Sequence, residues 1–346
     1  AVKAAPEAAP LLALQTLAAC APRRDEREQL ASLRFLVAHV APLLRAPAPP
    51  LRREAALCCC TLLAPADAAA PLDGAAGAMV GHVLSLLVGV GVADPDAHIR
   101  QAVLQALDWR FHEHLCEGQR LRTVSLALHD ESLAVRLTVL PLLGQLSTLN
   151  PAAILSQLRK LMLVLQCELA ADEPLAHPLA RRRKEEAAET LTLLVRHAPR
   201  LARTYCRPVL DALLPLLRST PHAATAASLF LTLAELLSVA TSRLDLYAEE
   251  LLALLVQALR ESGSSHKREA ALTALERLVA CSGPAAFKEP PYDLCPSLLP
   301  TLLQLLATEG EDTKAVKLLG MLGALEPLQY RAIIARVAAP RAADGG

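Results

Sequence analysis

Aromatic residues and isoleucine are scarce in this chain. Aromatic side chains make up only 3% of its 346 residues, although hydrophobic residues make up 53%. Isoleucine occurs four times, and no stretch alternates between apolar and polar residues, so we expect essentially no β-sheet. The apolar residues are mainly leucine, alanine and valine, whose slim side chains let helices approach one another closely. The composition therefore predicts an all-α fold.

The chain also lacks net charge and catalytic motifs. Lys plus Arg and Asp plus Glu both number 35, whereas a nucleic-acid-binding surface spread over the chain needs a basic excess. The phosphate-binding patterns GxGxxG and GxxxxGK[ST], the kinase motifs HRD and DFG, and the hydrolase motif GxSxG are all missing. We expect a non-catalytic chain without a cofactor and without a nucleic-acid partner.

The nine cysteines form no recognisable framework. Their number is odd, no CxxC pair occurs, and most of them lie within apolar helical patterns. Buried thiols explain this better than disulfides do, and we interpret Cys58, Cys59 and Cys60 as small packed residues. His112, His114 and Cys116, with His98 nearby, leave a zinc site open as an alternative. A surface histidine pair is the favoured interpretation, because His114 points away on a helix and no further cluster completes the coordination.

The clearest pattern is a repeat around residues 94–151. Asp94 precedes Pro95, which suits a helix N-cap followed by the first helical position, and Arg100 lies in the helix that follows. Asp130 and Arg136 repeat this arrangement 36 residues after Arg100. The two expected buried stripes are Ile99, Val103, Leu104 and Leu107, then Val139, Leu140, Leu143 and Leu146. Asn150-Pro151 should end the second helix.

The same stripe recurs along the chain behind anchor positions 7, 53, 100, 136, 184, 226, 268 and 312, which are 36–48 residues apart. This period is typical of HEAT and armadillo repeats. We therefore predict a solenoid of about eight helical hairpins, forming one domain over residues 1–337 with a disordered tail at 338–346. Longer loops are expected at 64–78, 170–180 and 282–293. The proposed structural anchors are Asp94, Arg100, Asp130, Arg136, Lys184 and Arg268, whereas the repeat at Ala226 lacks a basic anchor.

Two further stretches have a simple structural interpretation. Residues 74–93 contain no charged side chain and are long enough to cross a bilayer. The amphipathic repeats on either side favour a buried helix instead, so no membrane span is predicted. The basic run from Arg181 to Lys184 is followed by Glu185 and Glu186, which favours a solvated helix start beside its own counter-charges. An acidic-partner patch or a localisation signal stays an alternative.

Several ordered segments between about residues 92 and 331 resemble the N-terminal HEAT region of target-of-rapamycin (TOR) kinases. They include ADPDAHIRQAVLQALDWRFHEHL, LSTLNPAAILSQLRKLMLVLQCEL, HAPRLARTYCRPVLDALLPLL, KREAALTALERLVACSG and LLGMLGALEPLQYR. The resemblance implies a scaffold that carries homodimer contacts and docks regulatory subunits of the raptor and rictor kind. It also implies a cytoplasmic serine/threonine kinase that controls growth and associates peripherally with endomembranes. ATP and Mg would belong only to a kinase domain outside this sequence.

Two other functions stay open at this point. One is a HEAT adaptor of another class, such as a phosphatase scaffold or a transport carrier. The other is a helical-repeat metalloenzyme, a class that places His-Glu dipeptides on several repeats. The single dipeptide His112-Glu113 argues against the metalloenzyme.

Overall fold

The computed structural model describes residues 8–19, 26–63, 74–171, 173, 175, 177–240, 246–261, 263–286, 289–309 and 313–338. Side chains are described for these residues except 26–29, 281–286, 309, 313 and 336–338. Helices and turns account for the described ranges, which contain no β-strand, and the all-α prediction is confirmed. The chain divides into two compact units, residues 1–158 and 159–346, with the boundary inside one helix. A single domain over residues 1–337 stays a prediction.

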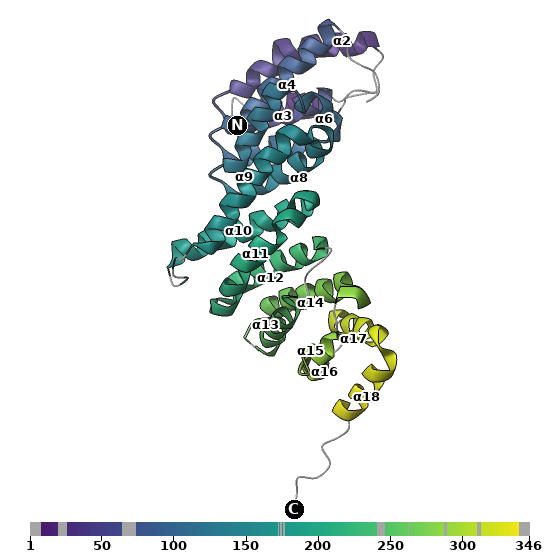
Figure 1. Cartoon of the computed structure of the whole chain (residues 1–346). Helices are drawn as coiled ribbons and strands as arrows, with labels where there is room; N and C mark the ends of the chain where they lie inside the picture. The colour runs from purple at the N-terminus through teal and green to yellow at the C-terminus, as the bar shows by residue number, and fades with distance from the viewer. Residues whose placement is uncertain are drawn as a thin grey trace, which may run out of the picture. The chain divides into compact units, whose positions relative to one another are not determined.

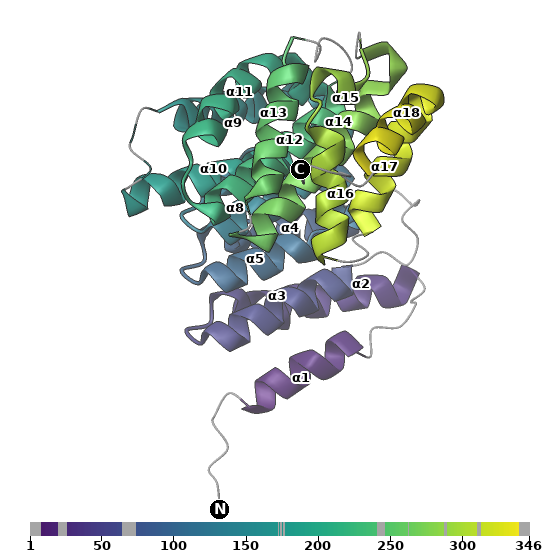
Figure 2. The same ribbon diagram turned by 90° about the horizontal axis from the view of Figure 1, so that it is seen from below.

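The first unit is built from two layers of helices (Figure 2). One layer stacks α1 (Ala8–Ala19), α3 (Pro49–Leu63), α5 (Ala97–Ala106) and α8 (Leu133–Leu149), each against the next. The second layer begins with α2 (Glu26–Phe35), which continues as a π-helix, η1 (Leu36–Val40), and a 3₁₀-helix, η2 (Ala41–Arg45). It goes on through α4 (Ala75–Ala93), η3 (Trp109–Phe111), α6 (His112–Leu115), α7 (Gly118–Leu126) and η4 (Ala127–His129). The boundary between the units falls in α9 (Pro151–Ala170).

The second unit repeats this arrangement (Figure 1). One layer stacks α10 (Pro178–His197), α12 (Ala223–Val239), α14 (Ser265–Ala286) and α17 (Thr313–Leu325) in succession. The other helices are α11 (Pro199–Ser219), α13 (Ala248–Arg260), α15 (Pro291–Leu294), α16 (Leu298–Glu309) and α18 (Pro327–Ala338). Polar contacts also join neighbouring repeats: the Tyr247 hydroxyl donates to Asp211 Oδ1 at 2.7 Å, which links α13 to α11.

The predicted stripes form the core wherever their register is correct. All four residues predicted for α8, Val139, Leu140, Leu143 and Leu146, are at most 1% exposed. The stripes in α5, α10, α12 and α14 are buried as well. Every anchor position falls in or directly before a helix of one layer in each unit. These helices are α1, α3, α5 and α8 in the first unit, and α10, α12, α14 and α17 in the second. Each period of the sequence repeat therefore corresponds to one helical hairpin.

Two of the predicted registers are wrong by about one residue. In α3 the anchor is Arg52, because Arg52 pairs with Asp94, whereas the side chain of Arg53 is half exposed. Of the stripe predicted behind Arg53, Ala56, Cys60 and Leu63 are buried and Leu57 is only half-buried. In α17 the stripe behind position 312 fails, since Val316 is 51% exposed. There the buried face consists of Ala315, Leu318 and Leu322.

The helix ends also differ in part from the predictions. Asn150 ends α8 as expected. Asp94 and Asp130 do not cap the helices that follow them, because those N-caps are Asp96 and Ser132, two residues further on. The loop expected at 282–293 is shorter, since α14 continues to residue 286. The loop at 170–180 is confirmed between α9 and α10, although α10 already begins at residue 178. The loop expected at 64–78 is too long at its end, because α4 begins at residue 75, and residue 338 of the expected tail ends α18. The remaining predictions for 64–73 and 339–346 lie outside the described residues.

Candidate functional site: a buried arginine–aspartate ladder

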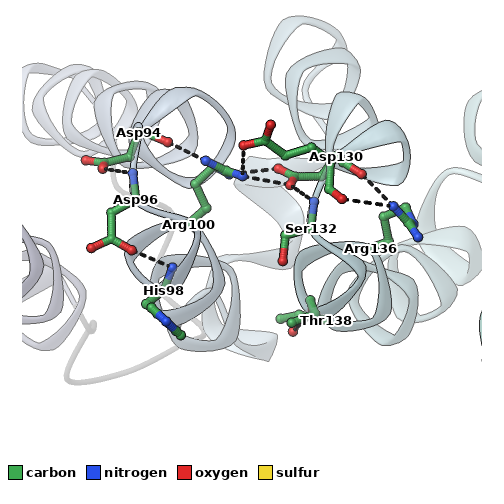
Figure 3. Close-up of polar contacts among 10 residues, drawn as sticks. Asp94, Asp96, His98, Arg100, Asp130, Ser132, Arg136 and Thr138 are labelled. Carbon is green, nitrogen blue, oxygen red and sulfur yellow. Dashed lines mark hydrogen bonds and ion pairs between the residues drawn. The ribbon is translucent and has the colours of Figure 1, made fainter. Parts of the chain in front are cut away.

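Arg100 is held in the interior of the first unit by contacts with two turns. Its Nε and Nη2 donate to the two carboxylate oxygens of Asp130, each at 2.8 Å, and Nη1 donates to the carbonyl of Asp94 at 2.6 Å (Figure 3). The side chains of Arg100 and Asp130 are only 5% and 6% exposed. A bidentate guanidinium–carboxylate pair fixes both distance and orientation. Arg100 therefore joins the repeat of α5 to the repeat of α8.

The preceding repeat makes the same contact. Arg52 donates to Asp94 through Nε at 2.7 Å and through Nη2 at 3.0 Å, and its Nη1 donates to the carbonyl of Ala46. Arg136, in the next repeat, donates from Nη1 to the carbonyl of Asp130 at 2.8 Å. In all three repeats the arginine contacts the carbonyl six residues before it. We call Arg52, Asp94, Arg100, Asp130 and Arg136 the arginine–aspartate ladder.

The two aspartates sit in turns that their own side chains stabilise. Asp94 Oδ1 accepts from the backbone N–H of Asp96 at 2.9 Å, and Asp130 Oδ1 accepts from that of Ser132 at 2.8 Å. Each is a turn in which the side chain bonds the backbone two residues on. The true cap Asp96 then accepts from the N–H of His98 (Figure 3). Each ladder aspartate thus serves both its own turn and the arginine of the preceding repeat.

The electrostatics keep the ladder ionised. Burial pushes the pKa of Asp130 upwards, but hydrogen bonds from Arg100 and the Ser132 backbone, together with the charges of Arg100 and Arg136, hold the pKa below its usual value. The pKa of Asp94 is lowered in the same way by Arg52 and the Asp96 N–H against the opposing effect of burial. Arg52 with Asp94, and Arg100 with Asp130, neutralise each other inside the unit. This arrangement can fix the register of the repeats.

The two anchors predicted for the second unit, Lys184 and Arg268, differ in how deeply they are buried. Lys184, in α10, is 2% exposed and donates to the carbonyls of Glu168, Leu169 and Ala171 at 3.4, 2.9 and 2.7 Å. The basic run is therefore not fully solvated, although Arg182 pairs with Glu186 as expected. Arg268 is half-buried near the start of α14.

The repeat without a basic anchor is joined through hydroxyl groups. Thr232 of α12 lies 2.9 Å from the Thr192 hydroxyl of α10 and donates to the carbonyl of Ala188 at 3.0 Å. Thr225 donates to Glu185 Oε1 at 2.5 Å. Hydrogen bonds from threonine hydroxyls therefore take the place of the buried arginine–aspartate pair where Ala226 occupies the anchor position.

Sequence reasoning missed two buried or nearly buried arginines. The sequence predicted Arg53 as the anchor in place of its neighbour Arg52, and it gave no prediction for Arg120. Arg120, in α7, is 8% exposed and donates to the carbonyls of His114 at 2.7 Å and Gly81 at 3.2 Å. His114 again lies six residues before the arginine. A carbonyl six residues before an arginine is no sequence signal, because every residue supplies one, and further partners of Arg52 and Arg120 lie 42 and 39 residues away.

The groups considered for chemistry do not assemble into a reactive site. Burial raises the pKa of Cys58 to about 11 and that of Cys60 to about 12, and it also raises that of Cys59. All three thiols are buried, as predicted. Among the described residues no group of three or more His, Cys, Asp or Glu side chains could hold a metal ion.

One helix of the described ranges, α4, is long and apolar enough to cross a membrane. It packs against α2, α3, α5 and α7 of the first unit. Val83, Leu84 and Leu87 on its inner face are fully buried. This is the packing expected of a core helix, which passes the same test of length and composition.

Comparisons with known proteins relate the chain to one family of kinases. No family model matches the chain. Serine/threonine-protein kinase TOR2 of Saccharomyces cerevisiae is 33% identical over 286 residues, which are 82% of this chain and 11% of that protein. Serine/threonine-protein kinase mTor of Drosophila melanogaster is 31% identical over 258 residues, covering 73% of this chain and 10% of that protein. The chain thus spans about one tenth of the length of these relatives.

Solved structures of similar shape confirm the type of fold. The karyopherin Kap121p bound to Pho4p has a TM-score of 0.58 and 14% sequence identity, covering 97% of this chain and 38% of that chain. Kap121p bound to Ste12p gives the same TM-score at 15% identity, covering 97% and 37%. At this identity the similarity concerns the fold alone. Over the residues matched to the curated relatives, the chain therefore belongs to the target-of-rapamycin kinase family, as a non-catalytic HEAT-type segment spanning about one tenth of those proteins.

Proposed function

We propose that this chain is a scaffold segment of a TOR-type kinase, which docks regulatory subunits of the raptor or rictor kind and contributes to self-association of the whole protein. The observation that carries the proposal is the 33% identity to yeast TOR2 over 286 residues. The kinase activity, with its ATP and Mg, would belong to parts of the protein outside this segment. The same relationship supports our proposal of a cytoplasmic location with peripheral association with endomembranes.

The physical properties of the segment suit this role. Stacked hairpins present long surfaces whose outward residues can vary without disturbing the core. Several large apolar side chains lie on such surfaces, among them Trp109 at 66%, Leu246 at 68% and Leu328 at 83% exposure. Tryptophan is enriched among the residues that dominate protein–protein binding energy. A protein partner is therefore the class of ligand that these surfaces favour.

The test is binding of this chain to purified raptor-type and rictor-type subunits, measured by biolayer interferometry. We expect at least one subunit to bind, and Trp109→Ala to weaken that binding if the exposed indole contributes. Glu113→Ala, a change of an exposed residue nearby, serves as the matched control. Absence of binding by both subunits would contradict the docking role. An adaptor of another class would then be the better proposal, and the karyopherin-like fold by itself does not favour one.

A further inference from the structure

A groove of about 540 Å³ lies on the first unit between η2 and the C-terminal half of α4. One wall consists of residues around Leu44, Arg45 and Pro47, and the other consists of Ser85, Leu86, Gly89, Val90 and Ala93. The Arg52–Asp94 pair lies in its lining. All of these residues belong to the described ranges 26–63 and 74–171. The volume is within the range of about 300–1,000 Å³ that is usual for binding pockets.

The α4 wall is lined by small side chains. Ser85, Gly89 and Ala93 follow one another at intervals of four residues, which places them along one face of the helix. Leu86 and Val90, next to this line, are half-buried. Small side chains on one helix allow another element to approach its backbone closely, because the distance between packed helices depends on the side chains at the contact.

The space around the glycines of α4 differs between the groove face and the faces that pack within the first unit. A Cβ added to Gly91 would lie 3.3 Å from Val103, and one added to Gly81 would lie 3.4 Å from the Arg120 guanidinium. Both glycines therefore serve contacts within the first unit. A Cβ added to Gly89 would meet nothing within 4 Å. Glycine weakens a helix interior relative to alanine, and no internal contact accounts for it at position 89.

The charge of the groove is one-sided. Asp94 is neutralised by Arg52. Arg45, on the opposite wall, is exposed, and within the described part of the chain its guanidinium forms no ion pair. The remaining lining residues are uncharged. An apolar groove with one uncompensated cation at its edge is complementary to an apolar surface that carries a carboxylate.

We propose that this groove binds a short amphipathic helix of a partner protein, with leucine-like side chains over Leu86 and Gly89 and a carboxylate on Arg45. This is the helix-in-groove mode, in which apolar residues spaced by three and four positions anchor the helix. The proposal deepens the docking role proposed above, because it names the chemistry of one partner segment and the surface that receives it.

The test uses two fluorescein-labelled helical peptides and the full chain, with binding followed by fluorescence anisotropy. Both peptides carry leucines at i, i+3, i+4 and i+7, and they differ only in having glutamates or lysines beside this stripe. We expect the glutamate peptide to bind and the lysine peptide to bind at least about tenfold more weakly, a difference of about 1.4 kcal/mol. Arg45→Glu should reverse this order.

Gly89→Leu should abolish binding by filling the groove. The matched control is Gly320→Leu, because Gly320 also lies inside a helix with open space where a Cβ would be added, but in the second unit. Circular dichroism establishes that each variant is folded. Binding that survives Gly89→Leu, or that responds equally to Gly320→Leu, would overturn the proposal, as would failure of both peptides to bind.

Analytical sedimentation of the unlabelled chain tests whether the occupant of the groove is a second copy of the chain or a partner protein. If the chain dimerises, and Gly89→Leu makes it monomeric while neither peptide binds, the occupant is another copy and the assignment to a partner helix is wrong. If the groove fails these tests while raptor-type or rictor-type subunits still bind the chain, the general docking role stands and only the groove is refuted.

Discussion

Removing the carboxylate of Asp130 tests whether the ladder joins the repeats. Asp130→Ala leaves the buried guanidinium of Arg100 with the carbonyl of Asp94 and with Glu131, whose side chain is 84% exposed. Breaking a buried ion pair on one side typically costs about 3–5 kcal/mol. Because Arg100 keeps these two contacts, we expect the lower end, about 3 kcal/mol. Loss of a helix cap alone would cost only about 1 kcal/mol.

The assay is urea unfolding of the full chain, with amide hydrogen exchange of α5 and α8 to locate the effect. The matched control is Glu235→Ala, which removes another carboxylate that joins neighbouring repeats. Its partner Arg196 is 52% exposed, so this change should cost at most about 1 kcal/mol. Adding Arg100→Met to Asp130→Ala should restore part of the lost stability, because no charge is then left buried. If Asp130→Ala costs no more than Glu235→Ala, the ladder does not stabilise the stack.

The same variant has a predictable dependence on pH. The pKa of Asp130 is lower in the folded chain, because hydrogen bonds from Arg100 and Ser132 and the charges of Arg100 and Arg136 together outweigh the effect of burial. Such a group stabilises the folded state above its unfolded pKa of about 3.9, and the contribution is lost as the pH falls through the folded value. The difference between the wild type and Asp130→Ala should therefore be full at neutral pH and shrink in acid. An unchanged difference in acid would show that the ionised carboxylate is not responsible.

Three further outcomes can be checked directly. Leu143→Ala should lower the free energy of unfolding by about 2–5 kcal/mol, measured in urea, because Leu143 is completely buried. Native Cys167, which is exposed, should react with iodoacetamide long before buried Cys59, as mass spectrometry of the modified peptides would show; equal rates would contradict the packing of α3. Gly89→Ala should raise the thermal midpoint by stabilising α4 by about 0.5–1 kcal/mol, and a lower midpoint would mean that the groove is filled in the folded chain.

The repeat period and most of the core could be predicted from the sequence. Apolar residues at helical spacing determine which face of a helix is buried, so Val139, Leu140 and Leu143 were identified correctly without any structure. The stripe is ambiguous where apolar residues lie on more than one face of a helix. In α17, Val316 and Leu319 define one possible face and Leu318 and Leu322 another, and packing against α14 buries the one that contains Leu318.

The polar part of the ladder depends on contacts that are distant in sequence. Arg52 and Arg53 are adjacent and chemically identical, and only the position of Asp94, 42 residues later, decides which one is buried. Similarly, Asp94 and Asp96 can both cap a helix. Because Arg52 holds Asp94 outside the first turn, the cap falls to Asp96. Local sequence propensity therefore predicts neither which arginine is buried nor which aspartate caps the helix.

The second unit shows what the ladder adds to the stacking of helices. Between α10 and α12, Thr192 and Thr232 form a neutral hydrogen bond, and the apolar faces pack without any buried ion pair between them. Leucine and alanine packing, together with hydroxyl hydrogen bonds and the partly exposed Arg196–Glu235 pair, therefore holds these two repeats together without a buried ion pair. A bidentate arginine–aspartate pair, by contrast, tolerates little sliding of one repeat along the next, since both carboxylate oxygens must stay aligned with the guanidinium. We infer that Arg52 and Arg100 chiefly specify the register between repeats, and that burial of leucine supplies most of the stability.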